Sequence, residues 1–319
     1  MNLEQFCSAS KVVIVAGKGG VGKTTVTAAL ARVAARLGMR TLVLEIEGKS
    51  GLSTMFGREP LGYDEMELMP GVTGRTLTPE QALLDYLDTH GLKRVSKRLV
   101  RSGASEIIST AAPGIKDILV LGKVKSIEKH EDHDLILIDA PAAGHAVTFL
   151  QSPRGLLDAI RVGPIRKQAV DVIEMLSDPE RCRTILVTLA EETPVNEIVE
   201  TAFALEDRVG VSLAPVVVNG LYPGLGFDDG VVNMAGVRQA ADEAGIFVSD
   251  REATDLVSAA EFHSRRRGVQ LEQVTRLAAM LPLRQVPLPF VPRTEFGPAE
   301  LDVLADALAA GVEALPGAA

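Results

Sequence analysis

"VVIVAGKGGVGKTT", residues 12–25, decides the fold class of this chain. An aliphatic run typical of a buried strand leads into a glycine-rich loop, and a helical pattern of apolar residues follows the loop. Gly17, Gly22, Lys23 and Thr24 match the spacing G-x-x-x-x-G-K-[ST]. A strand, a loop and a helix in this order predict a site for nucleotide phosphates.

The chemistry of this loop follows from its residue types. Glycines let the backbone point several N–H groups at one phosphate, and the helix N-terminus adds a partial positive charge. Lys23 is expected to reach the β- and γ-phosphates, Thr24 to ligate Mg²⁺, and Thr25 to contact the α-phosphate. The loop residues predicted to bind the nucleotide are Gly17, Gly19, Gly20, Val21, Gly22, Lys23, Thr24 and Thr25.

The composition excludes several classes of protein. The 319 residues carry a formal net charge of −9, which argues against a general nucleic-acid binder. Cys7 and Cys182 cannot form a disulfide framework and suit a reducing compartment. Residues 1–11 lack the pattern of a signal peptide, and no apolar run approaches the ~20 residues of a membrane span. We therefore expect a cytoplasmic protein without a membrane anchor or a nucleic-acid partner.

Short aliphatic runs alternate with helical patterns along the chain. The runs are nearly continuous, which is typical of strands buried on both faces of a parallel sheet. The predicted strands are residues 12–16, 41–46, 134–139, 184–189 and 214–219, with a weaker one at 283–288. We therefore predict an α/β fold with a doubly wound, mainly parallel sheet of the P-loop NTPase kind.

Two stretches interrupt this alternation. Residues 58–130 contain helical patterns and no convincing strand, and residues 153–180 are also helical in pattern. We interpret both as helical insertions into a single P-loop nucleotide domain that spans residues 1–319. Further along the chain, Thr193 is the predicted N-cap of a helix that ends at Gly210.

Lys18 is a second lysine in the phosphate loop, where one lysine is enough to hold a phosphate. The fuller pattern GKGGVGKTT, residues 17–25, resembles the deviant Walker A motif of the MinD/ParA and arsenite-pump (ArsA-like) ATPases. That resemblance implies a dimer in which Lys18 reaches the partner's nucleotide and neutralises phosphate charge, as an arginine finger does. The alternative is that Lys18 adds positive potential to the site of its own subunit.

"LILIDAPAAGHAVTFLQSP", residues 135–153, narrows the resemblance. This stretch is similar to the second switch of the arsenite-pump ATPases and of their relatives that target tail-anchored membrane proteins. The resemblance implies that Asp139, at the end of the predicted strand, lies near Mg²⁺ and that the backbone N–H of Gly144 senses the γ-phosphate. His145 falls on the family's G-H pair, and the alternative for it is an ordinary capping or core histidine.

"EIEGKSGLSTMFG", residues 45–57, matches the first switch of that family less closely. The family carries an Asp that orients the attacking water, and Glu47 takes its position here. We therefore expect Glu47 to be catalytic and to lie at the Mg²⁺ site with Thr24 and Asp139. The alternative is that Glu45 and Glu47 only tune Mg²⁺ or face solvent. Because Glu is one methylene longer than Asp, slow or partner-dependent hydrolysis would be consistent with this sequence.

Two later segments resemble those that enclose adenine in the family. "VVVNGLYP", residues 216–223, places Asn219 where the family reads the edge of the base. "QVPLPFVPRTEFG", residues 285–297, resembles the proline-rich loop that closes over the base. The residues expected to pack on adenine are Pro287, Leu288 and Pro289. The alternative is that these prolines simply end a strand.

The sequence lacks several features of the family. It has no C-x-x-C, so no zinc is expected, and two distant cysteines cannot supply an arsenite site. Ligands for an iron–sulfur cluster near the second switch are also missing. The chain has one ATPase unit where the pumps carry two in tandem, so the active form is expected to be a homodimer or a heterodimer with a paralogous ATPase.

Candidate surfaces for a client protein are less specific. Met55, Met66 and Met69 could line an adaptable apolar groove, although core packing is the commoner role of methionine. Residues 92–101 combine an apolar stripe with lysines and arginines, which suits either an anionic partner or a solvated surface helix. The basic run at 264–268 allows the same two interpretations. These patterns identify no client.

Together these observations predict a Mg²⁺-dependent ATPase of the ArsA-like family that acts as a nucleotide-switched dimer and binds or targets a hydrophobic client protein. Its predicted catalytic residues are Lys18, Lys23 and Glu47, and its predicted cofactors are ATP and Mg²⁺. One alternative is a MinD/ParA-like positioning ATPase, and another is a low-turnover nucleotide-binding regulatory subunit paired with a paralogue. The sequence leaves open the client, the composition of the dimer, whether tail-anchored targeting applies, and the turnover rate.

Overall fold

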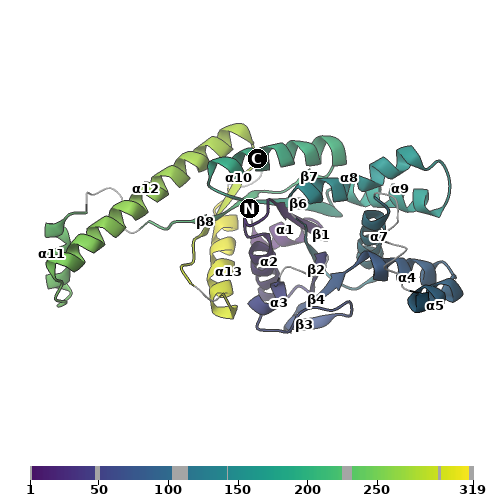
Figure 1. Cartoon of the computed structure of the whole chain (residues 1–319), viewed down its shortest axis with the longest axis horizontal. Coiled ribbons are helices and arrows are strands. Elements are labelled where there is room, and N and C mark those ends of the chain that lie inside the picture. Colours follow the sequence, from purple (N-terminus) through teal and green to yellow (C-terminus); the bar gives the residue numbers. More distant parts are fainter. Residues whose placement is uncertain are drawn as a thin grey trace.

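The computed structural model describes residues 2–46, 51–102, 114–141, 143–224, 232–293 and 296–315. They form an elongated molecule with a central sheet, a group of helices at one end and a projecting pair of helices at the other (Figure 1). The strands are β1 (Val12–Gly17), β2 (Thr41–Ile46), β3 (Met66–Met69), β4 (Val72–Leu77), β5 (Leu135–Asp139), β6 (Cys182–Leu189), β7 (Ser212–Leu213), β8 (Val216–Leu221) and β9 (Gln285–Pro289).

Within the described residues the strands form one nine-stranded sheet in the order β3-β4-β2-β5-β1-β6-β8-β9, and β7 pairs with β6. Every pairing is parallel except that of β3 with β4. The central strands are almost fully buried, because helices cover both of their faces. This architecture confirms the predicted α/β class with a mainly parallel sheet, and the weak sixth strand of the prediction is β9.

Helices on the two faces of the sheet bury two apolar cores. One face carries α1 (Leu3–Ser8), α2 (Lys23–Arg36), α3 (Leu52–Met55) and α13 (Pro298–Glu313). The other face carries α7 (Ile115–His130), α8 (Ala143–Ala159), α9 (Pro164–Ser177) and α10 (Glu192–Ala204). Successive strand residues enter opposite cores, as Val13 and Ile14 of β1 do. A shift of one residue would exchange the two cores, so the register of each central strand is fixed from both sides.

The stretch 58–130 is only partly helical, which corrects the sequence prediction. β3 and β4 form an antiparallel pair there at the edge of the sheet, and the helical part begins with α4 (Pro79–Thr89) and α5 (Lys93–Ser102). The sequence of β4, VTGRTL, carries a glycine and an arginine and so lacks an obvious strand pattern. Gly74 leaves room for two leucine side chains, since an added Cβ would lie 2.9 Å from Cδ1 of Leu68 on the neighbouring strand and 3.1 Å from Cδ1 of Leu61.

Helix α8 continues through Pro153, where the sequence analysis expected an insertion to begin. A proline has no N–H to donate to the carbonyl four residues earlier in a helix. Here that carbonyl belongs to Phe149, and the hydroxyl of Ser152 donates to it at 2.8 Å. The neighbouring hydroxyl therefore replaces the missing backbone bond and lets the helix pass through the proline.

Helix α10 begins earlier than predicted. Its N-cap is Glu191, two residues before Thr193. Pro194 does not prevent the earlier start, because the first-turn N–H groups of a helix have no partner within it. A π-helical turn (Leu205–Val209) follows α10, and Gly210 ends it. The φ of Gly210 is 76°, in the left-handed region, and the sequence predicted that the helix ends at this residue.

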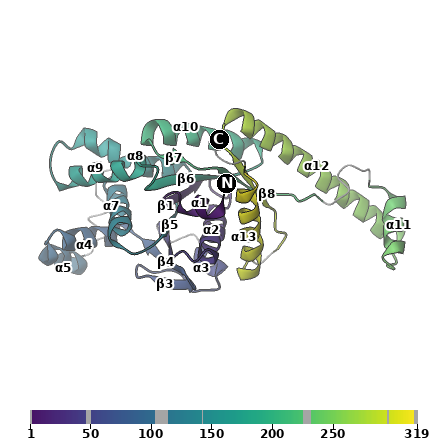
Figure 2. The same ribbon diagram turned by 180° about the vertical axis from the view of Figure 1, so that it is seen from behind.

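A pair of helices projects from the sheet and was not identified from the sequence. α11 (Met234–Glu243) and α12 (Asp250–Met280) pack against each other, and only the C-terminal part of α12 lies against β8 and α10 (Figures 1 and 2). We call residues 232–263 the arm. Among the described residues no helix, not even the 31-residue α12, is both long and apolar enough to cross a membrane.

Candidate active site

The glycine-rich loop joins β1 to α2 at the carboxyl edge of the sheet. β1 lies between β5 and β6, and ligands of doubly wound proteins bind at such an edge, where the strand order reverses. α2 begins at Lys23, and its N-cap is Gly22, which has no side chain to bond the first-turn N–H groups. These N–H groups and the positive end of the helix dipole are therefore available to an anion in the loop.

Two glycines of the loop are fixed by close contacts. A Cβ on Gly17 would lie 2.3 Å from the carbonyl oxygen of Val187 on β6. Gly22 has a φ of 91°, and a Cβ there would lie 2.2 Å from Nδ2 of Asn219. That Nδ2 donates to the carbonyl of Val21 at 2.9 Å, so the end of β8 supports the loop directly.

Thr24 and Asp139 bring a hydroxyl and a carboxylate together below the loop. Oγ1 of Thr24 donates to Oδ2 of Asp139 at 2.7 Å, which joins the first turn of α2 to the end of β5. Asp139 is only 5% exposed. Oxygen ligands of these two types are those that Mg²⁺ prefers. The pair therefore fits the metal that the sequence predicted at these residues.

Lys23 is held within the loop. Its Nζ donates to the backbone carbonyl of Lys18 at 3.0 Å. Burial lowers the pKa of Lys23, and the negative charge of Asp139 opposes that shift. The ammonium of Lys23 donates here to a neutral carbonyl oxygen. A negatively charged phosphate oxygen would bind the ammonium more strongly and displace this carbonyl.

Lys18 leaves the loop in another direction. Its ammonium forms an ion pair with the carboxylate of Glu197 on α10. The side chain of Lys18 is 51% exposed, so the pair lies at the surface. The structure of a single copy therefore ties the loop to α10, and the role of Lys18 at a partner's nucleotide stays a prediction.

Glu47 lies outside the residues that the structure describes. Glu45, two residues earlier, is nearly buried and lies opposite Asp139 on the neighbouring strand. Its Oε1 accepts from the N–H of Leu52 at 3.2 Å, and its Oε2 accepts from the hydroxyl of Thr76 at 3.3 Å. Glu45 thus joins the start of the first-switch segment to Leu52 within it and to the neighbouring strand β4. The available sequence signal for this role was an acidic residue within an otherwise aliphatic strand.

The second switch begins where β5 ends. Gly144 lies in the first turn of α8, which follows that strand. A hollow of about 370 Å³ lies between α7, α8 and the ends of β2 and β5, and its lining includes Ile46, Pro141 and His145. His145 is exposed, which excludes the core-histidine alternative. The ends of both switch strands and two helices therefore meet around one space.

The predicted base site is only partly assembled from the expected residues. Pairing of β9 with β8 places Pro287 and Pro289 beside the strand that carries Asn219. Leu288, in contrast, is fully buried in the core that contains α2 and α13. A fully buried side chain has no surface left for a base, so we withdraw Leu288 from the set expected to pack on adenine.

An aromatic pair beside this site was not anticipated. The rings of Tyr222 and Phe290 are stacked, with centroids 5.0 Å apart and planes inclined by 4°. Tyr222 follows Asn219 by three residues, and Phe290 directly follows Pro289. The guanidinium of Arg266, on α12, lies 5.5 Å from the centre of the Tyr222 ring. The part of α12 that directly follows the arm, which we call the root of the arm, therefore lies next to the predicted base site.

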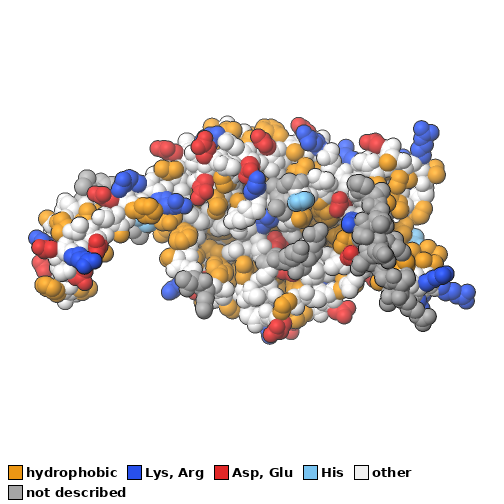
Figure 3. Space-filling view, viewed as in Figure 1, with side chains coloured by type: hydrophobic (Ala, Val, Ile, Leu, Met, Phe, Trp, Pro, Cys, Tyr) orange, Lys and Arg blue, Asp and Glu red, His pale blue; other side chains and the backbone are white. Residues whose placement is uncertain are grey.

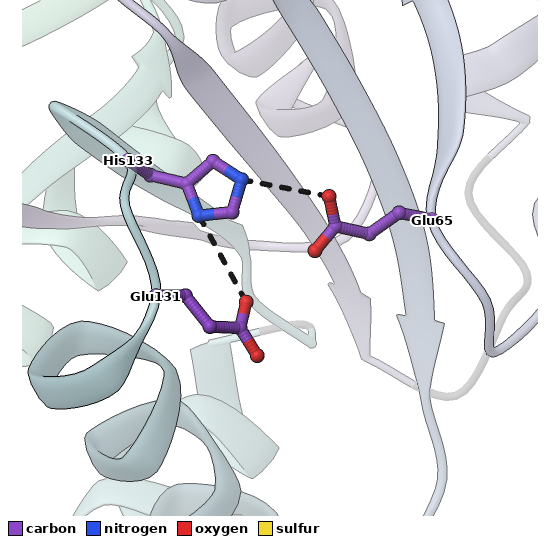
Figure 4. A group of neighbouring side chains, drawn as sticks. All are labelled: Glu65, Glu131 and His133. Atoms are coloured by element: carbon purple, nitrogen blue, oxygen red, sulfur yellow. Dashed lines mark ion pairs between the residues drawn. The ribbon is translucent and has the colours of Figure 1, made fainter.

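Among the described residues one group of three side chains, Glu65, Glu131 and His133, has the spacing of metal ligands (Figure 4). His133 lies just before β5, at the edge of the sheet opposite the glycine-rich loop. Nη2 of Arg75 already donates to both carboxylate oxygens of Glu131 at 2.9 Å, and Nη1 lies 3.6 Å from Glu65. Because the guanidinium of Arg75 already contacts both carboxylates of this group, we interpret it as an ion-pair network that holds the edge strand.

Most of the chain is similar in sequence to known proteins. Residues 10–168, which span the glycine-rich loop and the ends of β2 and β5, match the anion-transporting ATPase family. ATPase BagA of Mycobacterium tuberculosis is 30% identical over 286 residues, which cover 84% of this chain and 84% of that protein. The arsenical pump-driving ATPases of Escherichia coli and Acidiphilium multivorum are each 27% identical, and the match covers 65% of this chain and 39% of either pump ATPase.

Proposed function

Because this chain belongs to the anion-transporting, ArsA-like ATPase family, we propose that it hydrolyses ATP with Mg²⁺ at the loop between β1 and α2 and uses the cycle to hold and release a client protein. The observation that carries the catalytic part is the 2.7 Å contact between Thr24 and Asp139. It gathers a hydroxyl and a carboxylate for the metal directly below the helix N-terminus that would hold the phosphates.

Each phosphate has a proposed set of contacts. The N–H groups at the start of α2 hold the phosphates nearest the loop, and Lys23 exchanges the Lys18 carbonyl for a β- or γ-phosphate oxygen. Mg²⁺ bound at Thr24 and Asp139 would supply positive charge to the same oxygens. The N–H of Gly144 contacts the γ-phosphate, and Glu47 orients the attacking water and accepts its proton.

Asn219 is proposed to select adenine. One N–H of its Nδ2 donates to the loop, and we propose that its Oδ1 reads the base, where a carbonyl oxygen accepts hydrogen bonds but does not donate them. Adenine offers an amino group at its outer edge, whereas guanine offers a carbonyl there. Pro287 and Pro289 supply apolar surface beside the ring. The site is therefore expected to prefer ATP over GTP.

We propose that ATP brings two copies, or one copy and a paralogue, face to face. In that dimer Lys18 leaves Glu197 for the phosphates of the partner's nucleotide, which carry more negative charge than one carboxylate. The hollow beside His145 touches α7 and α8, so a movement of either switch would be passed to the helical end of the molecule. That end, built from α4, α5, α7, α8 and α9, is the proposed client-binding region.

Asp139→Asn tests the catalytic part of this proposal. The change keeps the shape of the side chain and removes the charge that would hold the metal. We expect hydrolysis of ATP to fall by about 10²-fold or more while ATP still binds in a titration. Asp134→Asn is the matched control, since Asp134 is an exposed partner of Arg40 just before the other end of β5. If Asp139→Asn hydrolysed ATP as fast as the wild type, Asp139 would not hold the metal and the proposed metal site would be wrong.

A second candidate is a low-turnover nucleotide-binding subunit that needs a paralogue. It is favoured by the ion pair of Lys18 with Glu197, which keeps this lysine on its own subunit in a single copy. A single-turnover assay with protein in excess over ATP separates the two functions. A complete turnover by the purified chain supports the enzyme, whereas turnover only after a paralogue is added supports the regulatory subunit.

A further inference from the structure

The arm carries an apolar groove between its two helices. The groove has a volume of about 910 Å³, and its walls include Val237, Ala240 and Ala244 of α11 and Leu256 and Ala259 of α12. Leu256 is 51% exposed although it lies in this groove. A concave apolar surface on a projecting element is typical of a site that another protein segment covers.

The surroundings of the groove are acidic. Residues 232–262 of the arm contain six carboxylates and two arginines, and one of these arginines, Arg238, is paired with Asp250. Three more arginines follow at 265–267, on the side of the sheet, where Arg265 is paired with Glu261 and Arg266 with Glu191. A second hollow of about 460 Å³ shares part of the groove's lining and contains Asp242 and the almost fully exposed Phe247. The arm therefore offers an apolar floor with negative edges, which complements an apolar stripe flanked by positive charges.

Helix α5 has that complementary chemistry. Leu92, directly before the helix, and Val95 are both nearly half exposed and lie three residues apart. The first six residues of α5 include the basic residues Lys93, Arg94, Lys97 and Arg98. Positive charges at a helix N-terminus oppose the helix dipole, so an acidic neighbour would relieve an unfavourable arrangement. Figure 3 shows basic side chains at this end of the molecule, and hydrophobic, acidic and some basic ones on the arm.

We propose that α5 of one copy docks into the arm groove of a second copy of this chain. Leu92 and Val95 enter between α11 and α12, and the basic residues of α5 face the carboxylates beside the groove. The two surfaces lie at opposite ends of the elongated molecule in both views, so one copy cannot join its own (Figures 1 and 2). Charge complementarity and this separation together favour a second copy over a contact within the chain.

The contact is compatible with two kinds of assembly. Two antiparallel copies related by a two-fold axis make it twice and form a closed dimer, whereas copies stacked in one direction make it once per neighbour and form a ring or a chain. It uses neither the glycine-rich loop nor Lys18. Association through the arm is therefore expected without nucleotide, which separates it from the ATP-dependent dimer proposed above.

Charge reversal tests the proposal. Sedimentation of the full chain without nucleotide is expected to show reversible self-association at low salt that weakens at least about tenfold in 0.5 M NaCl. The double changes Lys93→Glu with Arg94→Glu, and Asp242→Lys with Glu243→Lys, are each expected to abolish it. Both place charges where the helix dipole favours them, so folding is preserved. All four changes in one chain are expected to restore association.

The control and a second measurement use other residues. Glu206→Lys with Asp207→Lys reverses an exposed acidic pair away from both surfaces and is expected to leave association unchanged. A mixture of Leu92→Cys and Leu256→Cys chains is expected to form an intermolecular disulfide that neither chain forms alone. The native Cys7 and Cys182 are buried, and burial raises their pKa to about 11 and about 12, so they do not compete. A monomeric wild type, a failure of the fourfold variant to reassociate, or no mixed disulfide would overturn the proposal.

Discussion

At the scale of single residues, Gly22 is constrained by both backbone and space. Its φ of 91° is unfavourable for any residue with a Cβ, and that Cβ would lie 2.2 Å from Nδ2 of Asn219. The same amide supports the loop by donating to the Val21 carbonyl. A methyl group at this position would therefore disturb the phosphate loop and the predicted base site together.

Gly22→Ala is expected to weaken ATP binding at least tenfold and to lower the free energy of unfolding by about 1–3 kcal/mol. Gly38→Ala is the matched control, since Gly38 also has a positive φ, of 79°, but a Cβ there would meet nothing within 4 Å. The control should show the cost of backbone strain with unchanged ATP binding. Calorimetric titration and thermal melts measure the two effects. Equal ATP affinities for the two variants would show that Asn219 does not hold the loop.

At the scale of secondary-structure elements, Arg75 holds the edge strand β4 to the rest of the fold. It is 8% exposed and is neutralised by Glu131, after α7, and Glu65, before β3. Arg75→Met removes the guanidinium from these two carboxylates and leaves only the longer contacts of His133, at 3.5 Å to Glu65 and 3.8 Å to Glu131. We expect the free energy of unfolding to fall by about 3 kcal/mol, measured by urea denaturation.

Arg40→Met is the control for this prediction, because Arg40 pairs with Asp132 and Asp134 in an exposed position. Exposed ion pairs contribute little, so the urea midpoint of this variant is expected to stay at the wild-type value. If Arg75→Met were as stable as Arg40→Met, the ion pairs of Arg75 would not contribute to the free energy of unfolding.

The elements also show what could be read from the sequence. Continuous aliphatic runs predicted the parallel strands, and the motif placed Lys23, Thr24 and Asp139 at one edge of the sheet. The sequence analysis did not predict β4, because acidic residues of two other segments stabilise its buried arginine and no local pattern reveals such contacts. The arm was missed for another reason: only Ala253, Ala260, Gln270 and Leu277 are buried along the 31 residues of α12, so its sequence lacks the regular apolar stripe of a helix that packs on a core.

Contacts between distant segments were equally hidden within the site. Lys18 and Glu197 are 179 residues apart in the sequence. Tyr222 directly follows β8 and Phe290 directly follows β9, yet their rings stack. The motif identified each residue's chemistry or its neighbourhood, but only the packed sheet decides which side chains meet. Leu288 shows the same limit from the other side. The resemblance predicted that its side chain packs on the base, but in β9 the alternation of side chains directs it into the core.

At the scale of the whole molecule, α10 connects the glycine-rich loop to the root of the arm. Glu197 of α10 holds Lys18, and Asn196 beside it accepts a hydrogen bond from Arg276 of α12. A change at the loop that breaks the first contact therefore acts on a helix that also supports the arm. The state of Lys18 is the point at which the proposed ATP-dependent dimer and the single copy differ.

Glu197→Gln tests whether this ion pair restrains the dimer. The exposed pair is worth at most about 1 kcal/mol, so releasing Lys18 is expected to strengthen ATP-dependent dimerisation about two- to fivefold, measured by sedimentation with a non-hydrolysable ATP analogue. Glu200→Gln, an exposed change on the same helix, is the control and should behave like the wild type. Lys18→Ala should bind ATP normally yet lose both the dimer and turnover, because the ammonium is needed only at the partner's phosphates. Normal turnover by Lys18→Ala would assign this lysine a role confined to its own subunit, and an unchanged Glu197→Gln would show that breaking the ion pair is not what limits assembly.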